Sequence, residues 1–387
     1  MKILMVLDHE FPPDPRVENE INSLTKAGHE IILACYTLQN RPTCEKSGST
    51  NIYRKPISKF IYKSSVGILK FPFYFNFWKS FLDSLSETLE FDAIHIHDLP
   101  LAKIGYEFAK KHNIPFVLDL HENWPSLLET SEHANTFLGK ILSTNKQWRK
   151  YEEKYTLLAD YVITVVEEMK NRLCEFGLSK DKAIVLSNTF NLDNKFEIES
   201  QKTNENTILY YAGGINKHRG LQVVIKGLKQ LVKQNKKIEL WVVGSGKYVS
   251  TLKEMVDNYD LNNYIRFYGQ KSFDETMELL SKSDIALIPH LKSEQTDNSS
   301  PNKLFQYMYF QKPVMVSDCM SLERVVNETN CGIVYKYDSP ESFSKSAQSI
   351  IKSGLLNTFG RNGRKSVLDK YNWDESAIPF LEMYNSL

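Results

Sequence analysis

Residues 288–318 read IPHLKSEQTDNSSPNKLFQYMYFQKPVMVSD and contain the clearest strand–loop–helix–strand pattern of the chain. The apolar strand Ile285–Ile288 leads into a polar loop, a helix opens at Ser300–Lys303, and a second apolar strand follows at Pro313–Ser317. Serine is a preferred N-cap residue and proline is favoured at the first helical position, so the SPNK tetrapeptide marks a helix start. Short apolar strands separated by helices are typical of a parallel sheet covered on both faces.

The same alternation of strands and amphipathic helices runs through the rest of the chain. It is interrupted once, at Asn188–Asn206, a polar stretch without apolar periodicity. Two such series predict an α/β protein with two doubly wound, Rossmann-like domains, residues 1–188 and 207–370, that face each other across a cleft. The other predicted strands are Lys2–Leu7, Glu30–Cys35, Ala93–His97, Pro115–Asp119, Tyr161–Val165, Ala183–Leu186, Thr207–Ala212, Ile238–Val243 and Ile265–Tyr268.

Length and composition agree with two folded domains and exclude some classes of function. At roughly 150 residues per domain, 387 residues suggest two. The 48 Lys and Arg against 47 Asp and Glu argue against a nucleic-acid-binding protein, which usually needs a basic excess. No apolar run is long enough to span a membrane. The five cysteines are scattered without a CxxC pair, which predicts a reducing, cytoplasmic location and no zinc framework.

Loops that follow strands in the second half carry groups suited to phosphate. In GGINKHRGL, Gly213 and Gly214 let the backbone approach a ligand and Arg219 supplies a cation; a solvated glycine turn is the alternative. At the SPNK helix start, the N–H groups of Asn302 and Lys303 and the helix dipole predict an anion site, unless the helix is only well capped. The WVVGSGKY segment lacks the third glycine of a dinucleotide motif, which favours a simple tight turn.

In their order and spacing, these motifs resemble the retaining GT-B glycosyltransferases of glycosyltransferase family 4. The resemblance rests on FPPDPRVENEINSLTKAGHEI, FDAIHIHDLP, FVLDLHENWP, ADYVITVVEEM, GGINKHRGL, VVGSG, SPNKLFQYM and QKPV. It implies a C-terminal domain for a nucleotide-sugar donor, most often a UDP-sugar, and an N-terminal domain for the acceptor. It also implies that a final helix, 371–387, packs back on the N-terminal domain, and that transfer needs no metal or cofactor.

The resemblance further assigns roles to individual residues of the second half. Arg219 matches one of two phosphate-binding cations of the family, whereas Gly214 stands where the other is usual. Asn298 and Gln306 replace two glutamates that contact the donor sugar and the ribose. An amide keeps an acceptor oxygen but loses charge-assisted hydrogen bonds, so weaker donor binding or a changed donor preference is expected. The implied donor-binding residues are Gly213, Gly214, Arg219, Asn298, Ser300, Asn302, Lys303 and Gln306, and Arg219 is also expected to act in catalysis.

In the first half, FPPDPR follows the first strand. Its prolines stiffen the loop, so Arg16 is predicted to enter the cleft as a cation near the diphosphate or an anionic acceptor. The alternative places Arg16 on the surface of its own helix. By the resemblance, His121 would lie beside the donor sugar as a catalytic residue, and Asp98 or Glu122 would orient it or bind the acceptor.

The pair His95 and His97 lies on one face of a strand and invites a metal hypothesis with Asp98 and His121. No acidic D-x-D element accompanies these residues, so no metal is predicted. A Ser-His-Asp hydrolase is also disfavoured, because the sequence has no G-x-S-x-G elbow.

Residues 59–82, KFIYKSSVGILKFPFYFNFWKSFL, interleave four lysines with aromatic side chains. This pattern predicts a surface that enters an anionic membrane interface, at the inner face of the cell membrane. A core-facing helix is the alternative, and it is favoured after Phe75. A lipid-linked saccharide or growing polysaccharide is then the expected acceptor.

The predicted activity is thus a retaining hexosyl- or N-acetylhexosaminyltransferase in cell-surface glycan biosynthesis. Three alternatives remain open at this point: a sugar-nucleotide epimerase of the same fold, a non-catalytic carbohydrate-binding or scaffolding relative, and, least favoured, an NAD-dependent oxidoreductase.

Overall fold

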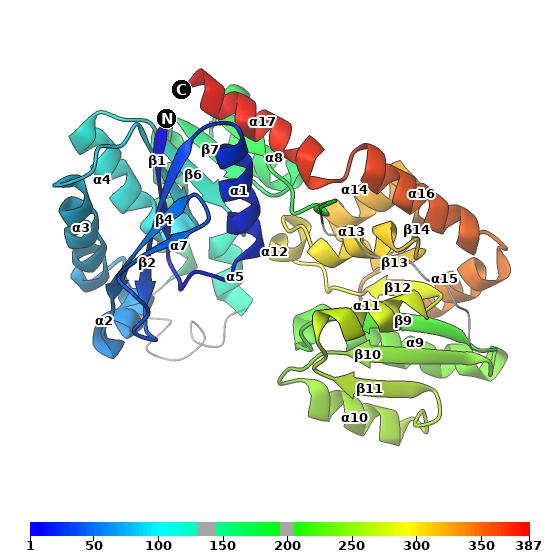
Figure 1. Cartoon of the computed structure of the whole chain (residues 1–387). Helices are drawn as coiled ribbons and strands as arrows, with labels where there is room; N and C mark the ends of the chain where they lie inside the picture. The colour runs from blue at the N-terminus through cyan, green and yellow to red at the C-terminus, as the bar shows by residue number, and fades with distance from the viewer. Residues whose placement is uncertain (131–143, 194–204) are drawn as a thin grey trace. The chain divides into compact units, whose positions relative to one another are not determined.

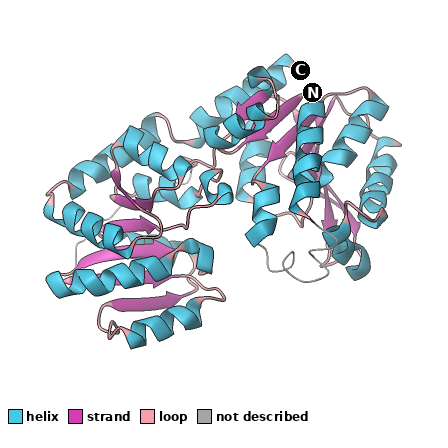
Figure 2. Cartoon of the chain, turned by 180° about the vertical axis from the view of Figure 1, so that it is seen from behind, coloured by secondary structure: helices cyan, strands magenta, loops and turns pink. Residues whose placement is uncertain are grey.

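The computed structural model describes residues 1–130, 144–193 and 205–387 (Figure 1). The chain divides into two units, Met1–Ser187 with Ser376–Leu387, and Asn188–Glu375. Part of the predicted linker 188–206, residues 194–204, lies outside the described residues. In each unit a largely parallel sheet lies between helices, as the view from behind also shows (Figure 2).

The first unit contains an eight-stranded sheet in the order β3-β4-β2-β1-β5-β6-β7-β8. Every neighbouring pair is parallel except β3 and β4. Its strands are β1 (Lys2–Leu7), β2 (Glu30–Thr37), β3 (Cys44–Ser47), β4 (Thr50–Pro56), β5 (Ala93–His97), β6 (Phe116–Leu120), β7 (Tyr161–Thr164) and β8 (Ala183–Val185). Its helices include α1 (Pro15–Lys26), α2 (Lys59–Ser64), α3 (Phe73–Ser86), α4 (Ala102–His112), α5 (Trp124–Thr130), α7 (Asn145–Leu158), α8 (Glu167–Glu175) and most of α17 (Trp373–Ser386).

The second unit contains a six-stranded parallel sheet in the order β11-β10-β9-β12-β13-β14. Its strands are β9 (Thr207–Ala212), β10 (Ile238–Val243), β11 (Ile265–Gly269), β12 (Ile285–Ile288), β13 (Val314–Ser317) and β14 (Gly332–Tyr335). Its helices include α9 (Leu221–Gln234), α10 (Val249–Asn258), α11 (Phe273–Ser281), α12 (Glu294–Asp297), α13 (Asn302–Tyr309), α14 (Met320–Thr329), α15 (Pro340–Lys352) and α16 (Leu356–Asp369).

The local sequence explains why α1 begins where it does after β1. Asp14 is the N-cap, and its carboxylate accepts hydrogen bonds from the backbone N–H groups of Arg16 and Val17. Pro15 occupies the first helical position, where its missing N–H costs nothing. Gly28, with φ of +92°, follows the end of the helix. The DPR motif thus starts a helix at the carboxyl end of β1 and directs Arg16 into the unit.

The aromatic stretch 59–82 has two different halves. On α3, the buried side chains Phe75, Trp78 and Phe81 belong to the core of the first unit. The segment from Phe60 to Phe73, the first residue of α3, instead exposes Phe60, which is 65% exposed, together with Tyr62, Val66, Phe71 and Phe73. The core-facing helix favoured after Phe75 is therefore present, and burial begins slightly earlier, at Tyr74. Among the described residues, no helix is both long and apolar enough to cross a lipid bilayer.

Candidate functional site

A buried cluster of charges lies at the carboxyl ends of β5 and β6 in the first unit. Asp119, on β6, is fully buried, and its carboxylate pairs with the guanidinium of Arg16, with Nη2 2.9 Å from Oδ1. Arg16 Nε lies 2.9 Å from the carboxylate of Glu20, one helical turn further along α1, and Nη1 donates to the carbonyl of Leu186 at 2.8 Å. One guanidinium therefore serves two buried carboxylates.

This arrangement corrects the prediction for Arg16. The side chain is neither an open cation nor a surface group, since Arg16 is only 8% exposed and its polar atoms face Asp119 and Glu20. Burial opposes ionisation, but Arg16 and then His121 lower the pKa of Asp119 well below its usual range. Burial and the nearby Asp119 raise the pKa of Glu20. The DPR motif therefore places the guanidinium of Arg16 beneath the candidate site and not within it.

His121 lies at the mouth of this cluster, with a side chain 14% exposed. Its Nε2 is 2.9 Å from Asp119 Oδ2, and its Nδ1 is 3.7 Å from Asp98 Oδ2. Burial disfavours the imidazolium, but the two carboxylates outweigh burial and raise the pKa of His121 to about 9. The ring is therefore protonated near neutral pH and its orientation is set from both sides.

The two acidic residues predicted beside His121 lie at the same edge of the sheet. Asp98 adopts a left-handed backbone, with φ of +67°, which is uncommon for a residue with a side chain. In this conformation its Oδ1 accepts the backbone N–H of His121 at 3.2 Å, and its own N–H donates to the carbonyl of Asp119. Glu122 follows His121 and is half-buried. Asp98 thus joins the ends of β5 and β6.

His95 and His97 lie beneath His121 and are fully buried. His95 Nδ1 is 2.8 Å from the hydroxyl of Tyr384, on α17, and its Nε2 is 3.7 Å from Glu20 and 3.8 Å from Asp119. Burial lowers the pKa of His97 to about 3, so this ring is neutral. The C-terminal helix therefore contributes a hydroxyl to the buried cluster.

The ligating atoms of Glu20, His95, His97 and Asp119 lie within 4.8 Å of one another, which would suit a metal ion. The guanidinium of Arg16 already pairs with both carboxylates, however, and the raised pKa of Glu20 reduces the negative charge left to balance. A second cation beside it would meet a like charge in a buried site, which is costly. The arrangement fits a structural network of hydrogen bonds and ion pairs better than a metal centre.

Because the pKa of His121 is raised, the stability that this residue contributes to the fold should depend on pH. Because the folded-state pKa of about 9 exceeds the ordinary 6.5, the imidazolium contributes stability that is complete below pH 6.5 and is lost as pH rises through 9. The difference in unfolding free energy between the parent and His121→Gln should therefore shrink between pH 6.5 and 10 in urea titrations. A constant difference over this pH range would contradict the ion-pair assignment.

In the second unit, one glycine-containing loop follows β9 and another follows β10, and the backbones of these two loops are in direct contact. The N–H of Gly213 donates to the carbonyl of Val243, and Gly213 and Gly244 have φ of +137° and +129°. A Cβ atom at Gly244 would collide with the carbonyl of Gly213, and one at Gly213 would collide with Nζ of Lys303. Gly214 is exposed at the tip of its loop. The two loops form a bare backbone surface at the carboxyl end of the sheet.

Two cations lie beside this backbone surface. Arg219 Nη1 donates to Nε2 of His290 at 2.9 Å, and burial followed by the charge of Arg219 keeps His290 neutral by lowering its pKa well below the usual range. Lys303 Nζ donates to the carbonyl of Ala212 at 2.6 Å. Burial and then Arg219 lower the pKa of Lys303 to about 7. Two cations thus share one space without a carboxylate partner among the residues that the structure describes.

The start of α13 differs from the prediction. The helix begins at Asn302 with Pro301 as its N-cap, and no side chain caps it, so Ser300 precedes the cap instead of forming it. A proline carries no side-chain acceptor, and the first N–H groups, at Asn302 and Lys303, therefore stay uncapped. This leaves the positive end of the helix dipole beside Lys303.

Asn298 and Gln306, the amides in place of the family's glutamates, lie before and within α13. Asn298 is buried, and its Nδ2 donates to the carbonyl of Glu294 at 2.6 Å. Its Oδ1 is buried without a hydrogen-bond partner in the described part of the chain. Gln306 is half-buried. An unsatisfied buried amide oxygen is costly, and a ligand hydroxyl would satisfy it.

Three functional candidates escaped the sequence analysis. His290 lies two residues after the end of strand β12, and this position at a carboxyl end was an available signal. No sequence signal pointed to Glu20 or Tyr384. Glu20 meets Arg16, and Tyr384 meets His95, only in the folded unit.

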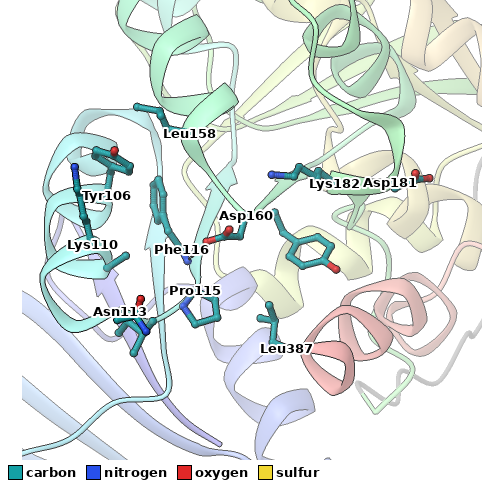
Figure 3. Close-up of a pocket in the computed structure, with 13 residues that line it drawn as sticks. Tyr106, Lys110, Asn113, Pro115, Phe116, Leu158, Asp160, Asp181, Lys182 and Leu387 are labelled. Carbon is teal, nitrogen blue, oxygen red and sulfur yellow. Dashed lines mark hydrogen bonds between the residues drawn. The ribbon is translucent and has the colours of Figure 1, made fainter.

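A pocket of about 640 Å³ lies elsewhere, at the amino ends of β6 and β7 (Figure 3). Lys110 and Lys182 line it together with Asp160 and Asp181. Asp160 already accepts the backbone N–H of Phe116 at 2.8 Å. Because its charges balance and it lies at the opposite strand ends from His121, this pocket is no part of the candidate site.

Comparisons with known proteins identify the family of the chain. Residues 16–194 match the family model for Glycosyltransferase Family 4, and residues 193–366 match the model for Glycosyl transferases group 1. An uncharacterized glycosyltransferase of Methanocaldococcus jannaschii, MJ1069, is 25% identical over 100% of this chain and 99% of its own length. The capsular polysaccharide biosynthesis glycosyltransferase CapM of Staphylococcus aureus is 25% identical over 65% of this chain and 69% of its own length.

Solved structures share the fold. The sucrose-phosphate synthase of Thermosynechococcus elongatus superposes with a TM-score of 0.77 at 16% identity, covering 100% of this chain and 98% of that one. The Anabaena protein HepE in complex with UDP gives a TM-score of 0.70 at 14% identity, with 100% of each chain covered. With a Family 4 model matching one half and a group 1 model matching the other, the chain belongs to the GT-B glycosyltransferases.

Proposed function

We propose that this glycosyltransferase moves a sugar from a nucleoside-diphosphate sugar, a UDP-sugar first of all, to a hydroxyl of a lipid-linked or polysaccharide acceptor with retention of configuration. The observation that carries the proposal is the pair Arg219 and Lys303 beside the bare backbone of Gly213 and the uncapped start of α13. The similarity to UDP-bound HepE supports the donor class, and the capsular role in the name of CapM supports the acceptor class.

In this proposal, the second unit stabilises the leaving diphosphate. Negative charge grows on the diphosphate as the glycosidic bond breaks, and preorganised cations and N–H groups lower the free energy of that transition state. Arg219 is held in place by His290, and the Lys303 pKa of about 7 would rise again next to a phosphate, so that the ammonium form is kept. Asn298 and Gln306 would accept and donate hydrogen bonds to the sugar and ribose hydroxyls.

The first unit would contribute His121 to the donor sugar and the acceptor. Nε2–H of the protonated ring is committed to Asp119, whereas Nδ1–H, 3.7 Å from Asp98, makes no hydrogen bond to it and would donate to a sugar hydroxyl. Asp98 and Glu122 would face the acceptor. Retention would follow from attack on the same face that the diphosphate leaves, with a phosphate oxygen taking the acceptor proton. Arg16 acts in this scheme as a positioning residue through Asp119.

The decisive experiment incubates the purified full chain with a panel of labelled nucleotide sugars, with and without a lipid-linked saccharide extract. Acceptor-dependent release of nucleoside diphosphate together with labelled lipid supports transfer. Interconversion of the nucleotide sugars without acceptor would favour the epimerase. Binding of a nucleotide sugar without any release would favour a non-catalytic relative, which the replacement of both glutamates by Asn298 and Gln306 makes the main alternative.

We also propose that the exposed aromatic segment from Phe60 to Phe73 contacts an anionic membrane. Phe60 and Phe73 lie 5.5 Å apart between ring centroids, and Phe71 stacks on Phe73 at 6.2 Å, so the three rings form one exposed apolar group. The exposed Lys63 and Lys70 flank them. Aromatic rings that enter the headgroup region, with lysines that meet anionic lipids, are typical of interfacial membrane binding.

Replacing Phe60, Phe71 and Phe73 together by serine should reduce sedimentation with vesicles that contain anionic lipid several-fold. The three rings are exposed, so the fold should survive, and circular dichroism would check this. Phe273, which is 47% exposed on α11 in the second unit, is the matched control, and Phe273→Ser should sediment like the parent. Equal sedimentation of the triple variant and the parent would remove the membrane proposal.

A further inference from the structure

A second pocket in the donor-side unit has no part in the proposed reaction. It measures about 730 Å³ and lies where β12 and β13 begin, at the strand ends opposite to those that carry His290. Ser281–Asp284, Phe310–Pro313 and the N-terminal half of α16 line it. Its volume is in the range of small-molecule sites, roughly 300–1,000 Å³.

The charges that line this pocket are mostly positive. Arg361 and Arg364, on α16, have no carboxylate partner in the described ranges, and Arg364 lies over the ring of Tyr309 at 5.2 Å. Lys312 is buried, and its ammonium donates only to backbone carbonyls, those of Ser281 and Ser283, at 2.7 Å each. Three cations therefore line the same pocket, and the lining does not supply one anion for each of them.

The remaining charged side chains of the lining do not cancel this excess. Lys282 pairs with Glu278, one turn back on α11. Asp284, the one carboxylate among the lining residues, accepts the backbone N–H of Ile208 at 2.8 Å, so it is partly committed to the sheet. The pocket therefore keeps a net positive charge and free arginine donors.

Small residues bring these cations together. A Cβ atom at Gly360 would collide with the carbonyl of Gln311, and one at Gly363 would lie only 3.3 Å from Met308. Because both are glycines, α16 packs closely on the end of α13 and the turn that precedes β13. This contact places Arg361 and Arg364 next to Lys312, which lies in that turn.

We propose that this pocket binds the phosphate group of a soluble phosphorylated metabolite. Guanidinium groups match the geometry of phosphate oxygens in a bidentate manner, and Arg is preferred over Lys for this reason. The ammonium of Lys312, which donates to two carbonyl oxygens and already has Asp284 as a nearby charge, gains further from an anion in the pocket. The apolar side chain of Leu356 offers a wall for the organic part of the ligand. The proposal does not depend on the sugar-transfer activity, since the two sites lie at opposite ends of the same strands.

The test uses the full chain with Arg219→Ala as parent, which removes the principal phosphate contact at the other site. Isothermal titration at low salt with sodium pyrophosphate, and separately with glucose 6-phosphate, measures binding. We expect the parent to bind both probes and the added changes Arg361→Ala and Arg364→Ala to raise the dissociation constant about ten-fold or more. Lys365→Ala, an exposed cation on the same helix outside the pocket, should change it less than about two-fold.

Two outcomes would overturn the proposal: a parent that binds neither probe, or a double variant that binds as tightly as the parent. If the double variant fails to fold, Arg361→Glu alone changes an exposed residue and serves instead. Sedimentation with phosphatidylglycerol vesicles separates the two sources of phosphate when it is measured in chains that also carry Phe60→Ser, Phe71→Ser and Phe73→Ser, so that the aromatic segment does not contribute. If Arg361→Ala with Arg364→Ala then abolishes vesicle binding but leaves pyrophosphate binding unchanged, the pocket binds a lipid headgroup, which would contradict a soluble ligand.

Discussion

Asp119→Ala is expected to lower the free energy of unfolding of the first unit by about 3–5 kcal/mol. The substitution removes the carboxylate that faces Arg16 Nη2 at 2.9 Å, in a cluster where Arg16 is 8% exposed and Asp119 is fully buried. A guanidinium left there without this partner keeps its desolvation cost and loses most of its compensation. Urea unfolding followed by fluorescence measures the change, analysed for the transition of this unit.

A double-mutant cycle makes the test specific. With Arg16→Met added, the guanidinium that lost Asp119 is gone, and Glu20, whose pKa is raised by burial, can stay neutral without it. Arg16→Met/Asp119→Ala should therefore be more stable than Asp119→Ala alone. Asp83→Ala is the matched control, because its partner Lys111 is more than half exposed and such pairs contribute less than about 1 kcal/mol. If adding Arg16→Met destabilises Asp119→Ala further, the buried ion pair is not the source of the loss.

Arg219→Ala should raise the dissociation constant for the nucleotide-sugar donor and lower kcat/KM by at least about ten-fold. The side chain is half-buried, it is held by His290, and it shares its space with Lys303. Its loss removes one of two cations that would stabilise the leaving diphosphate. Calorimetry with the donor and the acceptor-dependent release of nucleoside diphosphate measure the two effects separately.

Lys217→Ala is the control for charge in the same loop. Lys217 is exposed two residues before Arg219, so its loss should leave the donor affinity within about two-fold. A similar loss for both variants would indicate a general effect of loop charge. Unchanged kinetics for Arg219→Ala would refute its assignment to the diphosphate.

The central strands could be predicted from sequence because each is a short apolar run buried on both faces. Strands 2–7, 207–212 and 285–288 have the predicted bounds. Strand Thr50–Pro56 was missed, because its buried residues alternate with partly exposed ones instead of forming an apolar run. The edge strand Cys44–Ser47 beside it was missed too, since its four residues are all exposed and carry no apolar signal. Strand Gly332–Tyr335 was missed as well, and it is a short strand at the other sheet's edge. Edge strands pair through their backbones, which leaves little trace in the side-chain pattern.

The candidate site was predictable where its residues lie between the end of a strand and the start of the next helix. Arg219 and Lys303 were predicted from such segments, because the carboxyl ends of parallel strands meet at one edge, and His121 was assigned from the family resemblance. The position of Arg16 was predicted wrongly, because its ion-pair partner Asp119 lies 103 residues away. The local sequence around one of the two residues does not indicate that the other is its partner. Long-range pairing of charges is a property of the packed fold.

The hydroxyl of Tyr384 on His95 has a consequence for synthesis on the ribosome. The second unit is one continuous segment, so it can fold as soon as it has emerged. The first unit needs Ser376–Leu387, which are translated after the whole of the second unit. The first unit, although it is synthesised first, therefore cannot complete its fold until the second unit and Ser376–Leu387 have left the exit tunnel. Until then its buried histidines and carboxylates are incompletely enclosed.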